Sequence, residues 1–221
     1  MHSHAQDGQR KRQDGCSDLT GMSTSLRWFR IAWAALLGMM LVGNSGAATG
    51  PGVTPGKKEK TGMTMTITST SFVNNHAIPA RHTCDGVNVS PLLEWAGVPP
   101  ETKSLAVRAD DPDAPDPAAP KTTWVHWVVY NIPPDATGLP ETTSGEALPP
   151  GTLQGQNDWH QTGYRGPCPP IGKHRYFFKL YALDVVLPDL KHPSKATLEK
   201  AMHGHMLAHS ELIGLYQRPF R

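Results

Sequence analysis

The stretch GYRGPCPPIGKHRYFFKLYAL, residues 163–183, decides the fold class of this chain. Residues 163–172 contain three prolines and three glycines. Proline removes a backbone donor and fixes φ, so this part predicts a shaped loop and excludes a helix. Residues 174–183 are rich in aromatic and apolar side chains and predict a buried strand. Because side chains alternate between the two faces of a strand, His174, Tyr176, Phe178 and Leu180 share one face.

A histidine and a tyrosine therefore lie side by side where this loop enters the strand. Imidazole, phenol and the free N–H groups of a loop are the donors that a small anion needs. The alternative is a tight turn feeding a core strand, with His174 bonded to a nearby carbonyl. The loop alone does not choose between an anion site and a satisfied core histidine.

The composition indicates one domain of mainly β structure. A chain of 221 residues can build one domain with a good core. It contains 21 prolines and 21 glycines and is 38% hydrophobic, which favours short strands joined by many turns. The formal net charge is only +2, so no large positive field indicates a nucleic-acid partner.

The N-terminal region has the pattern of an export signal. A short basic segment, residues 22–30, precedes an apolar run at 31–42 and small residues at 43–48, which predict cleavage after Ala47 or Ala48. The run is shorter than the ~20 residues of a membrane-spanning helix, although an uncleaved anchor stays the alternative. A start at Met22 would give the signal an ordinary length. We therefore expect a periplasmic or secreted protein.

The domain boundaries follow from this pattern. Residues 1–48 are the N-terminal extension with the signal peptide, 49–62 are a Gly/Pro/Lys-rich linker, and 63–221 are the folded domain. Strands are expected at 63–70, 92–95, 104–109, 124–133, 174–183 and 211–218. A helix capped by Ser194 is expected to carry an apolar stripe from Leu198 to His209.

Acidic residues and a second histidine provide further site candidates. Asp110, Asp111 and Asp113 come directly after an expected strand, where three carboxylates repel one another unless cations or donors hold them. His126 lies in the strongest strand and is either a core residue or the wall of a pocket. His205 and His209 have the i,i+4 spacing of metal ligands, but no acid joins them, so we predict no metal site there.

The long segment 134–164 has no apolar run of more than two residues. A loop of this length is seldom idle in a compact domain, so it should cover something.

The cysteine count predicts one disulfide. Cys16 falls in the segment expected to be absent from the mature protein, which leaves Cys84 and Cys168 in an oxidising compartment. A bond that closes 84 residues would stabilise the fold by roughly 3–5 kcal/mol on the chain-entropy model. The alternative is a catalytic thiol at Cys168 with His174 as its base.

Several separated motifs resemble the phosphatidylethanolamine-binding protein family. They are DPDAP at 111–115, WVHW at 124–127, the Asn157-Asp158 pair, GPCPP at 166–170 and HRY at 174–176. The chain is most similar to the bacterial Raf-kinase-inhibitor-like branch, over residues 63–221. The resemblance implies a Greek-key β-sandwich of two antiparallel sheets with a short C-terminal helix. It also implies a small pocket for phosphate, carboxylate or a phospholipid head group.

The same resemblance implies which residues form the pocket. They are Asp111, His126, Gly166, Pro169, His174 and Tyr176, with Asp113 and Trp124 nearby. Eukaryotic members carry Ser-Arg after the DPDAP segment, whereas this chain carries Asp116-Pro117. A kinase-binding or peptide-binding role is therefore not carried over from them.

These residues support two functions of different kinds. The first is a binding protein without a cofactor, for a small anion that donors on His126, His174 and Tyr176 would hold, with a protein partner or a homodimer left open. Its affinity should rise as the pH falls through the histidine range. The second is a phosphoester hydrolase that uses His126, His174 and Asp111 as a metal site or as an acid–base set. No nucleophile with an adjacent base is evident, which favours the binding protein.

Overall fold

The computed structural model describes residues 64–142, 145 and 147–219, which belong to one compact unit. The expected signal peptide, its cleavage site, the start at Met22 and the linker lie outside the described residues. Within the described part, no helix is both long enough and apolar enough to span a membrane.

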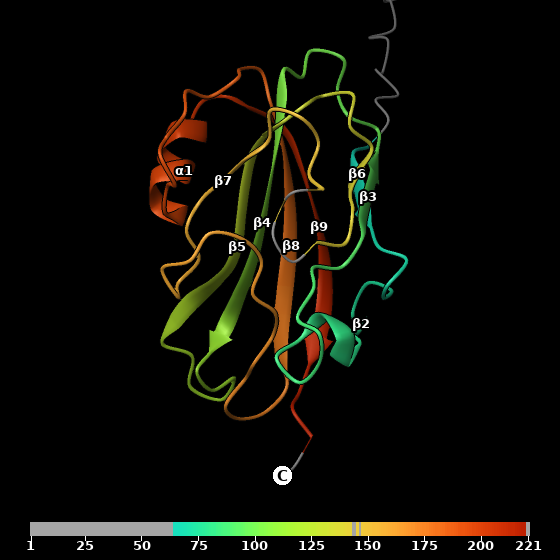
Figure 1. The fold of residues 1–221 in the computed structure, drawn as a ribbon, viewed down its shortest axis with the longest axis vertical. Helices are drawn as coiled ribbons and strands as arrows, with labels where there is room; N and C mark the ends of the chain where they lie inside the picture. Colours follow the sequence, from blue (N-terminus) through green and yellow to red (C-terminus); the bar gives the residue numbers. More distant parts are fainter. Residues whose placement is uncertain (1–63, 143–144, 146, 220–221) are drawn as a thin grey trace, which may run out of the picture. The chain divides into compact units, whose positions relative to one another are not determined.

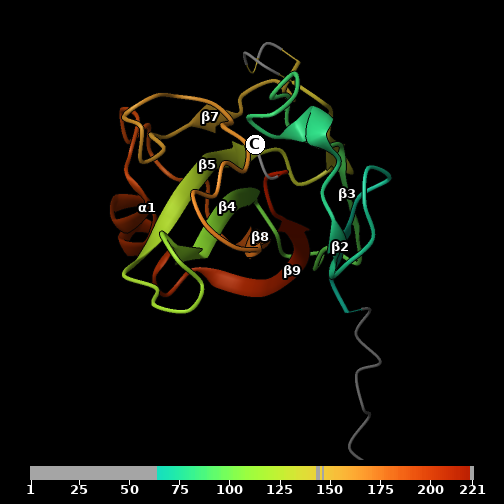
Figure 2. The same cartoon turned by 90° about the horizontal axis from the view of Figure 1, so that it is seen from below.

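The described strands form two sheets (Figures 1 and 2). The smaller sheet has the order β1 (Thr66–Thr68), β3 (Leu93–Ala96) and β6 (Gly138–Leu139). The larger has the order β2 (His76–Ala77), β9 (Met206–Tyr216), β8 (His174–Leu183), β4 (Ser104–Ala114), β5 (Thr122–Ile132) and β7 (Leu153–Gln154). All pairs are antiparallel except β2–β9, which is parallel. The mainly β prediction is confirmed.

The main core contains side chains from both sheets. Ile67 and Trp95 come from the small sheet, and Trp127 and Phe178 come from the large one. Every second residue of β8 from His174 to Ala182 is buried, which confirms the predicted two-residue period. Burial of one face of each sheet is what holds such a sandwich together.

The opposite face of the large sheet packs against α1 (Lys195–Met202) (Figures 1 and 2). Ser194 caps the helix by accepting a hydrogen bond from the Thr197 N–H. Leu198 and Met202 belong to a second cluster of buried residues that also includes Val128 and Leu183. A 3-10 turn, Ala80–His82, lies between β2 and β3.

Two boundary predictions were wrong at the C-terminal end. The helix stops at Met202, because Gly204 turns with a φ of +84° and the chain then enters β9 at Met206. Ten of the eleven residues of β9 pair with β8, so long-range pairing prevails over the helical pattern around His205 and His209. His205 and His209 therefore do not share a helical face.

The acidic segment is strand and not a turn after a strand. β4 continues to Ala114 with register shifts against β5, so Asp110, Asp111 and Asp113 are all buried. Each carboxylate has its own partner: Asp110 pairs with Arg108, Asp111 with His174, and Asp113 with Arg175. Separate partners remove the repulsion that the sequence implied.

Candidate ligand-binding site

A cavity of about 290 Å³ lies where β4 ends and β5 and β8 begin. These strand ends are at the bottom of the large sheet in Figure 1. Antiparallel pairing brings these three strand ends together. The walls come from the strand ends and from two loops. The lining residues are Asp111, Ala114, Pro115, Trp124, His126, Trp159, Cys168, Pro169, Pro170 and His174.

Five of the eight predicted site residues line this cavity: Asp111, Trp124, His126, Pro169 and His174. Gly166, Tyr176 and Asp113 lie close to the cavity but do not line it. They support the cavity walls through hydrogen bonds at Asp113 and Gly166 and through ring packing at Tyr176.

The two ring nitrogens of His174 are both bonded within the protein. Nδ1 lies 2.8 Å from an Asp111 carboxylate oxygen, and Nε2 lies 2.9 Å from the Ile171 carbonyl oxygen. Both partners are acceptors, so the simplest assignment is a ring that donates from both nitrogens and forms an ion pair with Asp111. The side chain is fully buried. His174 therefore holds Asp111 and the loop, and it keeps no nitrogen for a ligand.

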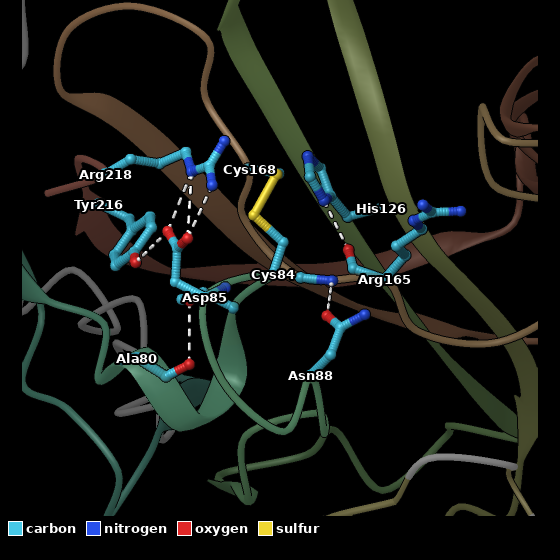
Figure 3. Close-up of a disulfide and its surroundings, with 11 residues drawn as sticks. Ala80, Cys84, Asp85, Asn88, His126, Arg165, Cys168, Tyr216 and Arg218 are labelled. Atoms are coloured by element: carbon cyan, nitrogen blue, oxygen red, sulfur yellow. Dashed lines mark hydrogen bonds and ion pairs between the residues drawn. A yellow bond between two sulfur atoms is a disulfide. The ribbon is translucent and has the colours of Figure 1, made fainter. Parts of the chain in front are cut away.

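His126 is bonded through one nitrogen only. Its Nδ1 lies 2.6 Å from the Arg165 carbonyl oxygen (Figure 3). Burial lowers the pKa of His126 below its ordinary value of 6.5, and the Arg165 carbonyl and nearby carboxylates offset this only in part. The ring is therefore neutral at neutral pH, with its proton on Nδ1. No described residue bonds Nε2, which is left on the side of the ring away from Arg165.

The Asp111 carboxylate has a fixed position. One oxygen accepts from His174, and the other accepts from the Asp113 N–H at 2.9 Å. Asp111 is 4% exposed and lines the cavity, so its carboxylate oxygens can also accept a hydrogen bond from a ligand.

Asp113 and Gly166 stabilise the strands and loops around the cavity. Asp113 accepts three hydrogen bonds from the Arg175 backbone and guanidinium, which lower the pKa of this carboxyl. The Gly166 N–H donates to Asn88 at 2.7 Å, and a Cβ at this glycine would lie 2.2 Å from the His82 carbonyl oxygen. Only glycine allows so close an approach of the two chain segments.

Tyr176 packs beside both histidines. Its ring centroid lies 5.2 Å from that of His126 and 6.3 Å from that of His174. The buried hydroxyl has no hydrogen-bond partner among the described residues. Burial and the Asp111 carboxylate raise the pKa of Tyr176, so it stays protonated.

Trp159 lines the cavity and was not predicted from the sequence. Asn157 bends the chain by accepting from the N–H groups of Trp159 and Gln161. This bend sets Trp159 edge-on to Trp124, with centroids 5.3 Å apart, and under the Arg165 guanidinium at 4.8 Å. Trp159 is the residue of the segment 134–164 that lines the cavity, and the segment is not one continuous loop, because it contains β6 and β7. The Asn157-Asp158 pair was the sequence signal beside Trp159.

The predicted disulfide between Cys84 and Cys168 is formed (Figure 3). It ties the cavity loop to the segment after the 3-10 turn, and the Cys84 N–H donates to the Pro167 carbonyl at 3.0 Å. The alternative of a catalytic thiol at Cys168 is therefore wrong. Within the described residues, no group of three or more His, Cys, Asp or Glu side chains could hold a metal ion.

Comparisons with known proteins agree with this fold. The family model described as phosphatidylethanolamine-binding protein matches residues 68–217. A UPF0098 protein from Methanothermobacter thermautotrophicus is 53% identical over 155 residues, which is 70% of this chain and 99% of that protein.

Two solved structures are also similar. A putative phosphatidylethanolamine-binding protein homologue, CT736 from Chlamydia trachomatis, has a TM-score of 0.65 and 41% identity, covering 71% of this chain and 99% of its own. YbcL from E. coli has a TM-score of 0.64 and 35% identity, covering 70% and 99%. By fold and by sequence, the chain belongs to the phosphatidylethanolamine-binding protein family.

Proposed function

We propose that this chain is a binding protein whose cavity holds a small ligand with a phosphate or carboxylate group, such as a phospholipid head group. The observation that carries the proposal is the open Nε2 of His126 beside the fixed carboxylate of Asp111, in a cavity of about 290 Å³. A cavity of this size suits one small polar group better than a drug-sized molecule.

The charges around the cavity support a small anion. The His174 ring balances the charge of Asp111, so an entering anion does not meet an uncompensated carboxylate. Trp124 adds an indole N–H that is buried without a partner among the described residues. On acidification His126 gains a second N–H, which is a donor for an anion.

The lining supports binding more than hydrolysis. Ser, Thr and Lys are absent from the lining residues, and Cys168 is oxidised. His174 has no nitrogen left to act as a base or a metal ligand. A hydrolase of the acid–base type would need a nucleophile that these walls do not supply.

The test is a titration of phosphate and of phosphoethanolamine, followed by NMR, between about pH 5 and 8. We expect His126 signals to shift and the affinity to rise as the pH falls. His126→Phe should lose this response, while His205→Gln, at an exposed histidine bonded to Asp184, should keep it. Flat affinity would remove His126 from the site, and no binding of either compound would overturn the proposal.

Export is part of the same proposal. A disulfide that joins the cavity loop to the rest of the domain is typical of oxidising compartments, which supports a periplasmic or secreted location. N-terminal sequencing of the protein from its native host should find a mature chain that begins after Ala47 or Ala48. A chain that still contains Arg27 would contradict cleavage.

A further inference from the structure

At neutral pH both His126 and Asp111 offer hydrogen-bond acceptors, and no donors, to a ligand in the cavity. The Arg165 carbonyl can only accept, so Nδ1 of His126 carries the proton and Nε2 of the neutral ring carries a lone pair. Asp111 is also an acceptor, because His174 and the Asp113 N–H donate to it. The two N–H groups of His174 are already used. A ligand that reaches Nε2 must therefore bring its own donor.

The surroundings of His126 keep its ring neutral. The ring is 3% exposed and lies between the aromatic rings of Trp159 and Tyr176. The charged and titratable groups around it are Asp111 on β4, Asp110 on the opposite side of the same strand, Asp158 and Arg165 between β7 and β8, and Tyr176 and His174 on β8. Burial outweighs the carboxylates among them and lowers the pKa of His126.

Phosphate compounds differ in whether they can donate to such a nitrogen. A phosphodiester is an anion with acceptor oxygens only, and so is the dianion of a phosphomonoester. The monoanion of a phosphomonoester keeps one P–O–H, and its second pKa is about 6. Its hydroxyl can donate to Nε2 while its other oxygens accept from wall donors such as the Trp124 N–H.

We infer that this cavity selects phosphomonoesters, bound with one proton, over phosphodiesters such as the linkage in an intact phospholipid. The inference rests on the proposed function and narrows it to one ligand class. A phosphodiester would place a second acceptor against the buried Nε2 of His126. Its affinity should therefore be roughly tenfold lower, or lower still, because an unpaired buried acceptor is costly.

Ethyl phosphate and dimethyl phosphate test this, because they are isomers with the same atoms. At about pH 6.5 a substantial part of ethyl phosphate is a monoanion with the same charge as dimethyl phosphate. Calorimetry with the disulfide-bonded protein should show ethyl phosphate binding at least roughly tenfold more tightly. Above about pH 7 its affinity should fall roughly tenfold per pH unit, with uptake of about one proton measured in buffers of different ionisation enthalpy.

The outcomes separate the inference from the function on which it rests. Equal binding of the two isomers, tighter binding of dimethyl phosphate, or binding of ethyl phosphate without proton uptake would overturn the inference and leave an anion site. Binding of neither isomer would overturn the proposed function itself.

Variants locate the acceptor. His126→Phe should bind the two isomers within about twofold of each other, whereas His205→Gln should discriminate as the wild type does. Circular dichroism shows whether the His126 variant folds, and the wild-type comparison decides the inference if it does not. A folded His126→Phe that still discriminates would show that Nε2 is not the acceptor.

Discussion

At the scale of single residues, the two histidines of the cavity differ because their ring nitrogens meet different partners. His174 is bonded on both sides, to Asp111 and to Ile171, and stabilises the wall. His126 is bonded on one side, to Arg165, and leaves the other nitrogen for a ligand. Two residues of the same type therefore differ in role: His174 positions the Asp111 carboxylate, and His126 is the one that we propose contacts the ligand.

The free energy of unfolding should depend on pH because His126 is buried. Its pKa is lower in the folded than in the unfolded state, so the unfolded state binds more protons below about pH 6.5. The stability that depends on the neutral ring is present above that pH and decreases as the pH falls toward the folded pKa. Urea unfolding at about pH 7.5 and 5.5 should show a smaller loss in His126→Gln than in wild type or in His205→Gln. The same loss in all three proteins would contradict this assignment.

The ion pair of Asp111 and His174 should stabilise the fold as well as hold the cavity wall in place. Asp111→Asn keeps an acceptor but removes the charge that balances the buried imidazolium, so we expect a loss of about 1–3 kcal/mol in unfolding free energy. Urea unfolding at neutral pH measures it. Asp135→Asn, at an exposed position, is the control and should change stability by less than about 0.5 kcal/mol. Equal effects would show that the pair contributes nothing.

At the scale of elements, β4 distributes its carboxylates to opposite sides of the large sheet. Asp111 faces the cavity, while Asp110 joins Arg108 on the side that α1 covers. Arg108 also bonds Glu199 of α1, and Lys179 of β8 reaches Asp110 at 3.2 Å. This charge network connects the helix to the sheet directly behind the site.

The side chains of this network should contribute unequally to the free energy of unfolding, because they differ in burial. Arg108 and Asp110 have side-chain exposures of 4% and 0%, whereas Glu199 is 46% exposed. Arg108→Met should cost about 3 kcal/mol, because it leaves Asp110 with Lys179 alone. Glu199→Gln should cost less than about 1 kcal/mol. Adding Asp110→Asn to Arg108→Met should recover part of the loss in urea unfolding. Equal costs for Arg108→Met and Glu199→Gln would refute the ranking.

At the scale of the whole molecule, the site depends on segments that are distant in sequence. The disulfide joins positions 84 residues apart, and Cys168 itself lines the cavity. The Tyr164 hydroxyl donates to the His82 carbonyl at 2.9 Å and strengthens the same connection. The segment that contains Trp159, the loop that contains Cys168 and the ends of β4, β5 and β8 must all assemble before the cavity exists.

Loss of the disulfide should therefore affect stability and binding together. The Cys84→Ser/Cys168→Ser double variant should lose roughly 3–5 kcal/mol of unfolding free energy. Its phosphate affinity should fall as well, because the loop that contains Pro169 is no longer tied to residue 84. Urea unfolding and a phosphate titration measure the two effects, with dithiothreitol-treated wild type as the matched comparison. Unchanged stability and unchanged affinity would show that the hydrogen bonds hold the loop without the bond.

The amino-acid sequence by itself determined the features that depend on local pattern or on pairs of residue types. The two-residue period placed His174 and Tyr176 on one buried face, the even pair of cysteines predicted the bond, and the separated motifs indicated the family. Local periodicity predicts which way a side chain points because it reflects the geometry of one strand.

Only the tertiary structure decided which partner each polar atom meets. Asp111 reaches His174 across 63 residues and the Arg165 carbonyl reaches His126 across 39, distances along the chain that no local pattern spans. For the same reason the end of α1 and the strand character of the acidic segment were settled by long-range pairing, and the place of Trp159 was settled by its packing against Trp124. Which histidine nitrogen has no hydrogen-bond partner among the described residues therefore depends on the folded structure.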